Sequence, residues 1–257
     1  MSDSLFDRPS FRPASAFLLL ALAALLLHSW ANIASVRILW DAADRAVFFT
    51  LNGSLADGII WQNIWAIGNA FAGDIVMGIF VTALFYLYAL SGKADQIIAR
   101  LSTFLLLATT AILAKFAMRF LSGGKRTSAS VELEPVVLIS EKVTWLETKD
   151  VSYDCFPSDH GTLLFLAVAF MFFFAGRRFG LAMLVVALVF ILPRLFSGAH
   201  WFTDMFVGSL TVALVASALV LCTPFHKALL NGFVWAFDRP LFLRVLKPFF
   251  PALRQGN

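Results

Sequence analysis

The chain has 257 residues, of which 60% are hydrophobic and 14% are charged. Soluble domains are about half apolar and about a quarter charged, so this composition excludes an ordinary soluble protein and predicts a polytopic membrane protein. The formal net charge of +4 does not indicate nucleic-acid binding, because the chain has no basic stripe with interleaved aromatic residues. We assign the basic residues to membrane topology and to contacts with membrane lipids.

We predict about six membrane-spanning helices, because about six apolar segments reach or approach the length that crosses a bilayer. These segments lie at 14–36, 74–92, 97–121, 160–176, 180–196 and 202–223. The first follows Arg8 and Arg12 but lacks a convincing cleavage site, so we interpret it as an uncleaved anchor and not as a secretory signal. The predicted fold class is all-α, with one membrane domain over residues 1–257.

The segments outside the predicted spans differ in character. Residues 37–73 are amphipathic and contain three Trp, so we expect them to lie along the outer face of the membrane. Residues 122–159 form a long polar loop on the same side. The tail 224–257 mixes aromatic and basic residues around prolines and is predicted to lie at the inner interface, on the side of the N-terminal tail 1–13.

The distribution of charge predicts the orientation. Lys and Arg concentrate in the tails and in the connections around 93–100 and 177–178, and the positive-inside rule makes that side cytoplasmic, with both termini. Most of the acidic and Trp residues fall on the opposite side. On this topology Cys155 and Cys222 lie on opposite membrane faces, so we expect no disulfide between them.

Three residues suited to phosphate chemistry lie at the junction of the last two spans: Arg194, His200 and Asp204. Polar and ionisable residues in membrane helices are costly and mark functional sites. Because His200 and Asp204 are four residues apart, we expect them on one helical face, where the carboxylate orients the imidazole. His200 is the predicted nucleophile and Arg194 the predicted phosphate ligand. The alternatives are a His that only caps a helix and an Arg that snorkels to the interface.

A second histidine lies at the predicted start of the fourth span, in Pro157–Ser158–Asp159–His160. Helix N-termini present unpaired N–H groups that suit a phosphate oxygen, and Ser158 is predicted to contribute to phosphate binding. His160 is the predicted general acid. Gly161 is expected to leave space for the substrate. The alternative is an ordinary helix cap.

Basic residues cluster near the end of the third span: Lys115, Arg119, Lys125 and Arg126. We predict that Arg126, Lys125 and Arg119 bind phosphate, although basic residues at a membrane boundary also contact lipid phosphates without taking part in catalysis. Asp159 would repel a phosphate unless it pairs with a base such as Arg126 or Lys149. Asp159 and Lys149 are therefore possible substrate-positioning residues. With six spans, all of these residues lie on the outer face.

These motifs resemble the type-2 phosphatidic acid phosphatase superfamily, which shares its helical fold with the vanadium haloperoxidases. The superfamily pattern consists of Lys/Arg-x6-Arg-Pro, Pro-Ser-Gly-His and Ser-Arg-x5-His-x3-Asp. The chain matches it with Arg119-x6-Arg126, Pro157–Ser158–Asp159–His160 and Arg194-x5-His200-x3-Asp204. It departs from the pattern with Thr127 in place of Pro, Asp159 in place of Gly and Pro193 in place of Ser.

Within this superfamily the chain looks most like the lipid A 1-diphosphate synthase branch. The residues that carry this likeness are Trp40–Asp41–Ala42–Ala43–Asp44, Lys125–Arg126, Ser128, Thr148–Lys149–Asp150, Asp154, Phe156–Pro157, Asp159–His160–Gly161, Pro193–Arg194, Gly198–Ala199–His200–Trp201–Phe202–Thr203–Asp204 and Val207–Gly208–Ser209. The resemblance implies an enzyme of the bacterial inner membrane with a periplasmic active site, without metal or cofactor. It would transfer the terminal phosphate of undecaprenyl diphosphate to a phosphate of lipid A through a phosphohistidine.

Two other functions remain open on the sequence. The same motifs serve a lipid phosphatase that acts on undecaprenyl diphosphate or phosphatidylglycerophosphate, with water as the acceptor. A transporter or scaffold is the alternative from another class. Transporters carry charged residues near the midplane and often show internal repeats, whereas here the charges gather at one membrane edge and no repeat is visible.

Overall fold

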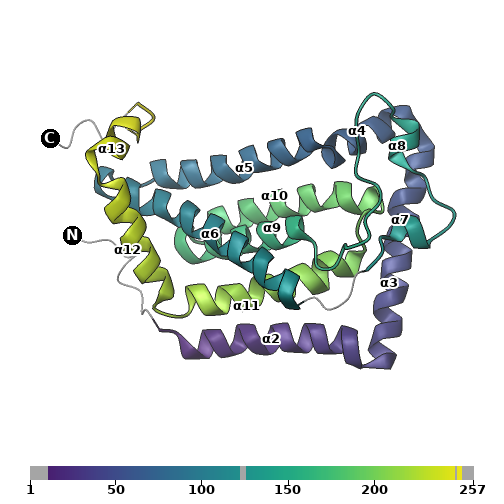
Figure 1. Ribbon diagram of the computed structural model, residues 1–257, viewed down its shortest axis with the longest axis horizontal. Coiled ribbons are helices and arrows are strands. Elements are labelled where there is room, and N and C mark those ends of the chain that lie inside the picture. The colour runs from purple at the N-terminus through teal and green to yellow at the C-terminus, as the bar shows by residue number, and fades with distance from the viewer. Residues whose placement is uncertain (1–10, 122–125, 247, 251–257) are drawn as a thin grey trace.

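The computed structural model describes residues 11–121, 126–246 and 248–250, and the described chain is mostly helical, with no strand (Figure 1). The first half contains α2 (Pro13–Asn32), α3 (Ala34–Gly53), η1 (Ser54–Asp57), α4 (Ile59–Asn69), α5 (Phe71–Leu90), η2 (Ala94–Gln96) and α6 (Ile97–Leu121). The second half contains α7 (Ala129–Glu132), α8 (Ile139–Lys142), α9 (Asp159–Phe170), η3 (Met171–Ala175), α10 (Arg177–Phe196), η4 (Asp204–Ser209), α11 (Leu210–Leu221), α12 (Phe225–Phe237) and α13 (Pro240–Leu246). Both η3 and η4 are π-helical turns.

Among the described residues, five helical segments are long and apolar enough to cross a bilayer: Pro13–Asn32, Phe71–Leu90, Ala94–Met118, Arg177–Phe196 and Asp204–Leu221. The remaining predicted span is the apolar segment Asp159–Ala175, which is shorter. It lies in the centre of the bundle, where α9 packs against α6, α10 and α11. The protein is therefore an all-α polytopic membrane protein, as the composition predicts.

Helix α2 illustrates why these helices require lipid. Only Ala23 of this helix is buried, while Phe17, Leu18 and Leu25 are exposed. A helix that is apolar all round must be covered on every side, and in this protein the hydrocarbon core of the bilayer covers it. The predicted first span, 14–36, is too long at its end, because Ile33 has extended backbone angles (φ −107°, ψ 97°) and separates α2 from α3.

Helix α3 runs across one end of the bundle, transverse to α2, and α4 lies at the same end (Figure 1). The loop that carries α7 and α8 covers this end as well. At the opposite end, α12 leads from the end of α11 to α13, which lies beside the end of α5 (Figure 1). At the start of α2, the Arg12 backbone N–H donates to the Cys222 carbonyl at 2.9 Å. The segments predicted to be interfacial thus lie across the two ends of the bundle.

The end that α3 crosses is also where the chain brings its polar residues together. Helices α6 and α10 end there, and α9 and η4 begin there. The core below is closed by side chains with no exposed surface, among them Leu164, Leu166 and Phe170 of α9. This packing fixes the helix ends, and the helix ends position the candidate site.

Candidate active site

His200 lies in a turn between α10 and η4, outside both helices. The turn needs Gly198, whose φ is +71°, and a Cβ there would lie 2.7 Å from the Phe48 ring. The helical face predicted for His200 and Asp204 is therefore not formed. The two side chains still approach, because Asp204 begins η4 and its Oδ2 accepts from the Trp201 backbone N–H at 2.8 Å. His200 Nδ1 lies 3.5 Å from the same oxygen.

The His200 ring is oriented by a backbone carbonyl. Its Nδ1 lies 2.9 Å from the carbonyl oxygen of Cys155. A carbonyl can only accept, so Nδ1 carries the hydrogen and Nε2 presents a lone pair in the neutral ring. Nε2 lies 3.4 Å from the Ser158 hydroxyl at the start of α9. This tautomer is the one that a nucleophilic imidazole needs.

Arg126 joins two buried carboxylates behind His200. Its Nη1 donates to Asp204 Oδ1 at 2.6 Å and its Nη2 to Asp44 Oδ2 at 2.8 Å. Thr203 completes the cluster, since its backbone N–H and its hydroxyl donate to Asp44 at 2.8 and 2.7 Å. Burial raises the pKa of Asp44 despite its contact with Arg126. Burial lowers the pKa of Arg126, but Asp204 and Asp44 outweigh it, so the net shift is upward and the guanidinium stays charged.

His160 lies in the first turn of α9, after Ser158 as the N-cap, as the sequence predicts. Its Nε2 lies 3.1 Å from Asp74 Oδ1 and 3.3 Å from Arg194 Nη2. Gly161 does not face the substrate as predicted. A Cβ at Gly161 would lie 2.6 Å from Ser209 Oγ, so this glycine serves the close packing of α9 against η4.

Arg194 is 3% exposed and its donors are already engaged. Nη1 donates to the carbonyl oxygen of Asn69 at 2.7 Å and also to its side-chain oxygen, while Nη2 donates to Asp74 Oδ1. Lys149 reaches the other oxygen of Asp74 at 3.2 Å. Asp74 therefore binds Arg194, His160 and Lys149 at once, and Arg194 contacts protein groups where the sequence predicted a phosphate.

The two histidines line one polar pocket of about 240 Å³. Its lining residues are Lys115, Met118, Ser152, Asp154, Phe156, Pro157, Asp159, His160 and His200. Lys115 Nζ lies 2.6 Å from Asp159 Oδ2. The predicted partners of Asp159, Arg126 and Lys149, are thus wrong, because α6 brings Lys115 to the pocket and the other two bases bind Asp44, Asp204 and Asp74.

An apolar groove of about 720 Å³ begins at this pocket, and the two share Met118, Phe156 and Pro157. The groove runs between α6 and α11 and reaches Leu27 of α2. Its other lining residues are Thr110, Leu113, Ala114, Ala117, Gly208, Thr211, Val212, Val215, Ala216, Leu219, Val220, Thr223 and Phe225. A polar pocket that continues into an apolar groove suits an amphipathic ligand.

One group among the described residues has donor atoms close enough together for a metal ion: Cys155, His200 and Asp204, within 4.8 Å of one another. Each of them already has a protein partner. His200 Nδ1 donates to a carbonyl and Asp204 binds Arg126. Burial, followed by the charge of Asp204, raises the pKa of the Cys155 thiol far above its usual value, so the sulfur stays protonated in this arrangement.

Two predicted phosphate ligands cannot be located. Lys125 and the side chain of Arg119 lie outside the described residues. The sequence analysis, in turn, overlooked Asp74, Asn69 and Thr203. Asp74 carried a signal, since a carboxylate at the first turn of an apolar span is costly without a partner.

Comparisons with known proteins identify the family of the chain. Residues 103–228 match the model of the PAP2 superfamily. The chain is 32% identical over 198 residues to the lipid A 1-diphosphate synthase of Escherichia coli (strain K12), a match that covers 76% of this chain and 81% of that protein. No solved structure matches the chain. The matched segment contains both histidines, Arg194 and Asp204, and the chain belongs to the PAP2 superfamily of enzymes that act on phosphate groups.

Proposed function

We propose that the protein is a phosphotransferase that moves the terminal phosphate of undecaprenyl diphosphate to a phosphate of lipid A. The observation that carries this proposal is the pocket shared by His160 and His200, in which the Cys155 carbonyl holds His200 Nδ1 and leaves Nε2 as the nitrogen available for attack. The similarity to a lipid A 1-diphosphate synthase supports the choice of substrates.

In the first step His200 Nε2 attacks the terminal phosphorus. A P–N bond forms and the P–O bond to undecaprenyl phosphate breaks, while His160 gives its proton to the departing oxygen. Asp204 and the Cys155 carbonyl stabilise the positive charge on the ring. Lys115 and the first turn of α9, which Ser158 caps, would bind the phosphate oxygens in the pocket.

In the second step a phosphate oxygen of lipid A attacks the phosphorus and the P–N bond breaks. His160 takes up the acceptor's proton and is ready for the next cycle. Arg194 Nη2 lies 3.3 Å from His160 Nε2, close enough for a phosphate in the pocket to replace Asp74 as its partner. Asp159, paired with Lys115, helps to position the acceptor, and Lys149 holds Asp74.

The groove between α6 and α11 accounts for the lipid part of the donor. It is lined by side chains that are almost all apolar, and it meets the polar pocket at Phe156 and Pro157. The diphosphate then lies against the histidines while the first isoprene units lie in the groove. Burial of each CH₂ contributes about 0.8 kcal/mol.

We also propose that the protein lies in the inner membrane as a single membrane domain, with the pocket facing the periplasm and both termini in the cytoplasm. The positive-inside distribution of Lys and Arg supports this orientation. A variant that lacks Cys155 and Cys222 and carries Glu147→Cys should react with an impermeant thiol reagent in intact spheroplasts. A reaction that occurs only after lysis would show that the protein has the opposite orientation.

The substrate assignment is tested by incubating the purified protein with undecaprenyl diphosphate, with and without lipid A. We expect lipid A to gain one phosphate mass and free phosphate to stay low when lipid A is present. Equal release of free phosphate in both cases, with no lipid A diphosphate, would make the protein a lipid phosphatase with water as the acceptor.

A further inference from the structure

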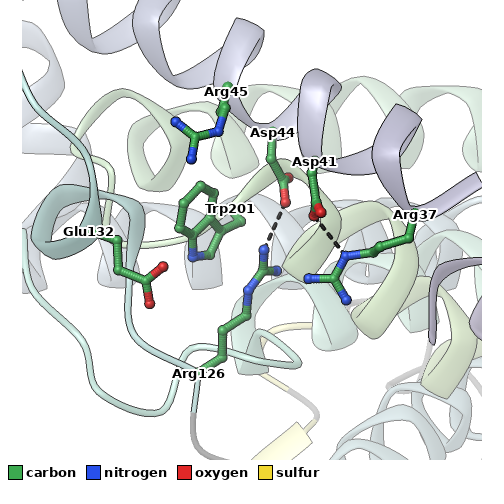
Figure 2. A pocket seen from close by; sticks show the side chains of 7 residues that line it. All are labelled: Arg37, Asp41, Asp44, Arg45, Arg126, Glu132 and Trp201. Atoms are coloured by element: carbon green, nitrogen blue, oxygen red, sulfur yellow. Dashed lines mark hydrogen bonds and ion pairs between the residues drawn. The ribbon is translucent and has the colours of Figure 1, made fainter. Parts of the chain in front are cut away.

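A second polar pocket, of about 400 Å³, lies on the other side of Arg126, between α3, α7 and the turn before η4 (Figure 2). Its lining residues are Arg37, Asp41, Asp44, Arg45, Arg126, Glu132 and Trp201. None of them lines the pocket of the two histidines. We call it the α3 pocket.

Part of the α3 pocket is structural. Asp44 binds Arg126 and Thr203 with both of its oxygens. Arg37 donates to Asp41 at 2.7 Å, and its guanidinium lies 4.5 Å from the centre of the Trp30 ring. Arg37, Asp41, Asp44 and Arg126 thus form one wall of the pocket, and the Arg126 guanidinium lies over the Trp201 ring, 4.7 Å from its centre.

Two charged side chains in the α3 pocket remain available. Arg45 of α3 and Glu132 of α7 are exposed, and within the described chain neither side chain has a hydrogen bond or an ion pair. In Figure 2 they approach Trp201 from different elements. One is a planar donor for an anion and the other an acceptor for hydroxyl groups.

This set of groups selects a ligand of mixed character. A purely anionic ligand would meet the carboxylates of Asp41, Asp44 and Glu132, and a cation would meet three arginines. A phosphorylated sugar satisfies both sets, because its phosphate pairs with a guanidinium and its hydroxyls donate to carboxylates.

We propose that the α3 pocket binds the phosphorylated saccharide headgroup of the acceptor lipid. This inference rests on the proposed phosphotransfer function. The pocket lies one ion pair away from the nucleophile, since Arg126 in its wall also binds Asp204, the carboxylate beside His200. A headgroup bound in the α3 pocket is placed on the Arg126 side of His200, while the donor lipid keeps its own groove.

The kinetic test uses the full-length protein with Arg45→Ala and Glu132→Gln. We expect Arg45→Ala to raise KM for lipid A at least about tenfold, which corresponds to about 1.4 kcal/mol, and Glu132→Gln to raise it severalfold. The kcat for transfer at saturating lipid A and the rate of phosphate release without acceptor should stay within about twofold of the wild type. The matched control is Lys142→Ala, an exposed cation of α8 at the same end of the bundle.

An unchanged KM for lipid A in both variants, with phosphate release intact, would overturn the proposal. A loss of phosphate release in both would also overturn it, because it would place these residues in donor chemistry. If the wild-type protein transfers no phosphate to lipid A, the proposed function is wrong. The binding test below then shows separately whether the α3 pocket binds a sugar phosphate.

The binding test uses glucosamine 1-phosphate, glucosamine and inorganic phosphate, titrated by calorimetry into the detergent-solubilised protein. We expect only glucosamine 1-phosphate to bind in the millimolar range and Arg45→Ala to abolish this binding. Equal binding of inorganic phosphate would show that the pocket binds anions in general and would contradict its assignment to a sugar phosphate. No binding of the sugar phosphate would overturn the assignment.

Discussion

His200 and His160 line the same pocket, yet different chemistry holds them. The His200 ring is anchored by a neutral backbone carbonyl at 2.9 Å, and its carboxylate, Asp204, lies farther away and is neutralised by Arg126. The ring of His160 is anchored directly by the carboxylate of Asp74. The Cys155 carbonyl fixes the tautomer of His200, whereas the Asp74 carboxylate holds His160 beside Arg194. The proposed roles of nucleophile and acid therefore rest on two different kinds of support, and the two can be tested separately.

The largest effect should come from the nucleophile side. We expect His200→Ala to lower phosphate transfer and phosphate release at least about 10⁴-fold, as removal of a nucleophile does in other enzymes. His28→Ala, at an exposed position of α2, is the matched control and should retain full activity. Mass spectrometry of the protein stopped during turnover should find phosphohistidine only when His200 is present. Activity above a tenth of the wild-type value in His200→Ala would assign the nucleophile elsewhere.

The ion pairs of Arg126 with Asp204 and Asp44 should contribute to the stability of the fold. Arg126→Met leaves Asp204 and Asp44 buried without their shared cation, and losing one partner of a buried pair costs about 3–5 kcal/mol. Denaturant unfolding in detergent measures this loss. Arg45→Ala, which removes an exposed and unpaired arginine, should change the free energy of unfolding by less than about 0.5 kcal/mol. A similar loss of unfolding free energy in the two variants would show that the ion pairs of Arg126 stabilise the fold no more than an exposed arginine does.

On the acid side, Asp74→Asn should lower transfer from the natural donor about 10²-fold. General acid catalysis contributes roughly 10²–10⁴-fold, and the amide no longer holds His160 as a charged partner would. The loss should shrink on an aryl phosphate whose leaving group needs no proton. Asp57→Asn, an exposed carboxylate of η1, is the control. An equal loss on both substrates would mean that Asp74 acts on binding or folding and not through His160.

The smallest effect should follow from changing Cys155, because its backbone carbonyl, and not its thiol, contacts His200. Cys155→Ala should keep phosphate release within about threefold of the wild type. Burial raises the pKa of this thiol and the residue has no exposed surface, so a Cys222→Ala protein should not react with a maleimide at pH 8 until it is unfolded. Rapid labelling of the native protein would contradict this environment.

The sequence was sufficient for those features that depend on local spacing. The apolar segments predicted the helices, because a bilayer imposes a minimum length on each of them. Ser158 before His160 predicted the start of α9, since a hydroxyl at this position accepts a backbone N–H of the first turn. The short spacing between Arg194, His200 and Asp204 predicted that these three residues lie close together at the junction of α10 and η4.

The partners of these residues could not be predicted, since they come from distant parts of the chain. Asp74 is 120 positions from Arg194, and Asp44 is 159 positions from Thr203. Which carboxylate meets which base depends on how α3 and α5 pack against α10. Asp159 shows the same difficulty, because its base is Lys115 on α6 and not one of the nearer candidates. The four-residue spacing of His200 and Asp204 also led to a wrong prediction that they share a helical face, whereas a turn at Gly198 brings them together.

The apolar groove has a consequence for how this enzyme meets its substrates. Its rim includes Leu113, Leu219 and Phe225, which are exposed on the surface of the bundle that lipid covers. If the donor is a lipid as proposed, we expect it to enter sideways by two-dimensional diffusion within a leaflet, so that its mole fraction among the surrounding lipids governs the rate. Adding empty detergent micelles or phospholipid at constant donor concentration should slow the reaction by surface dilution, while concentrating the protein in the same membranes should not.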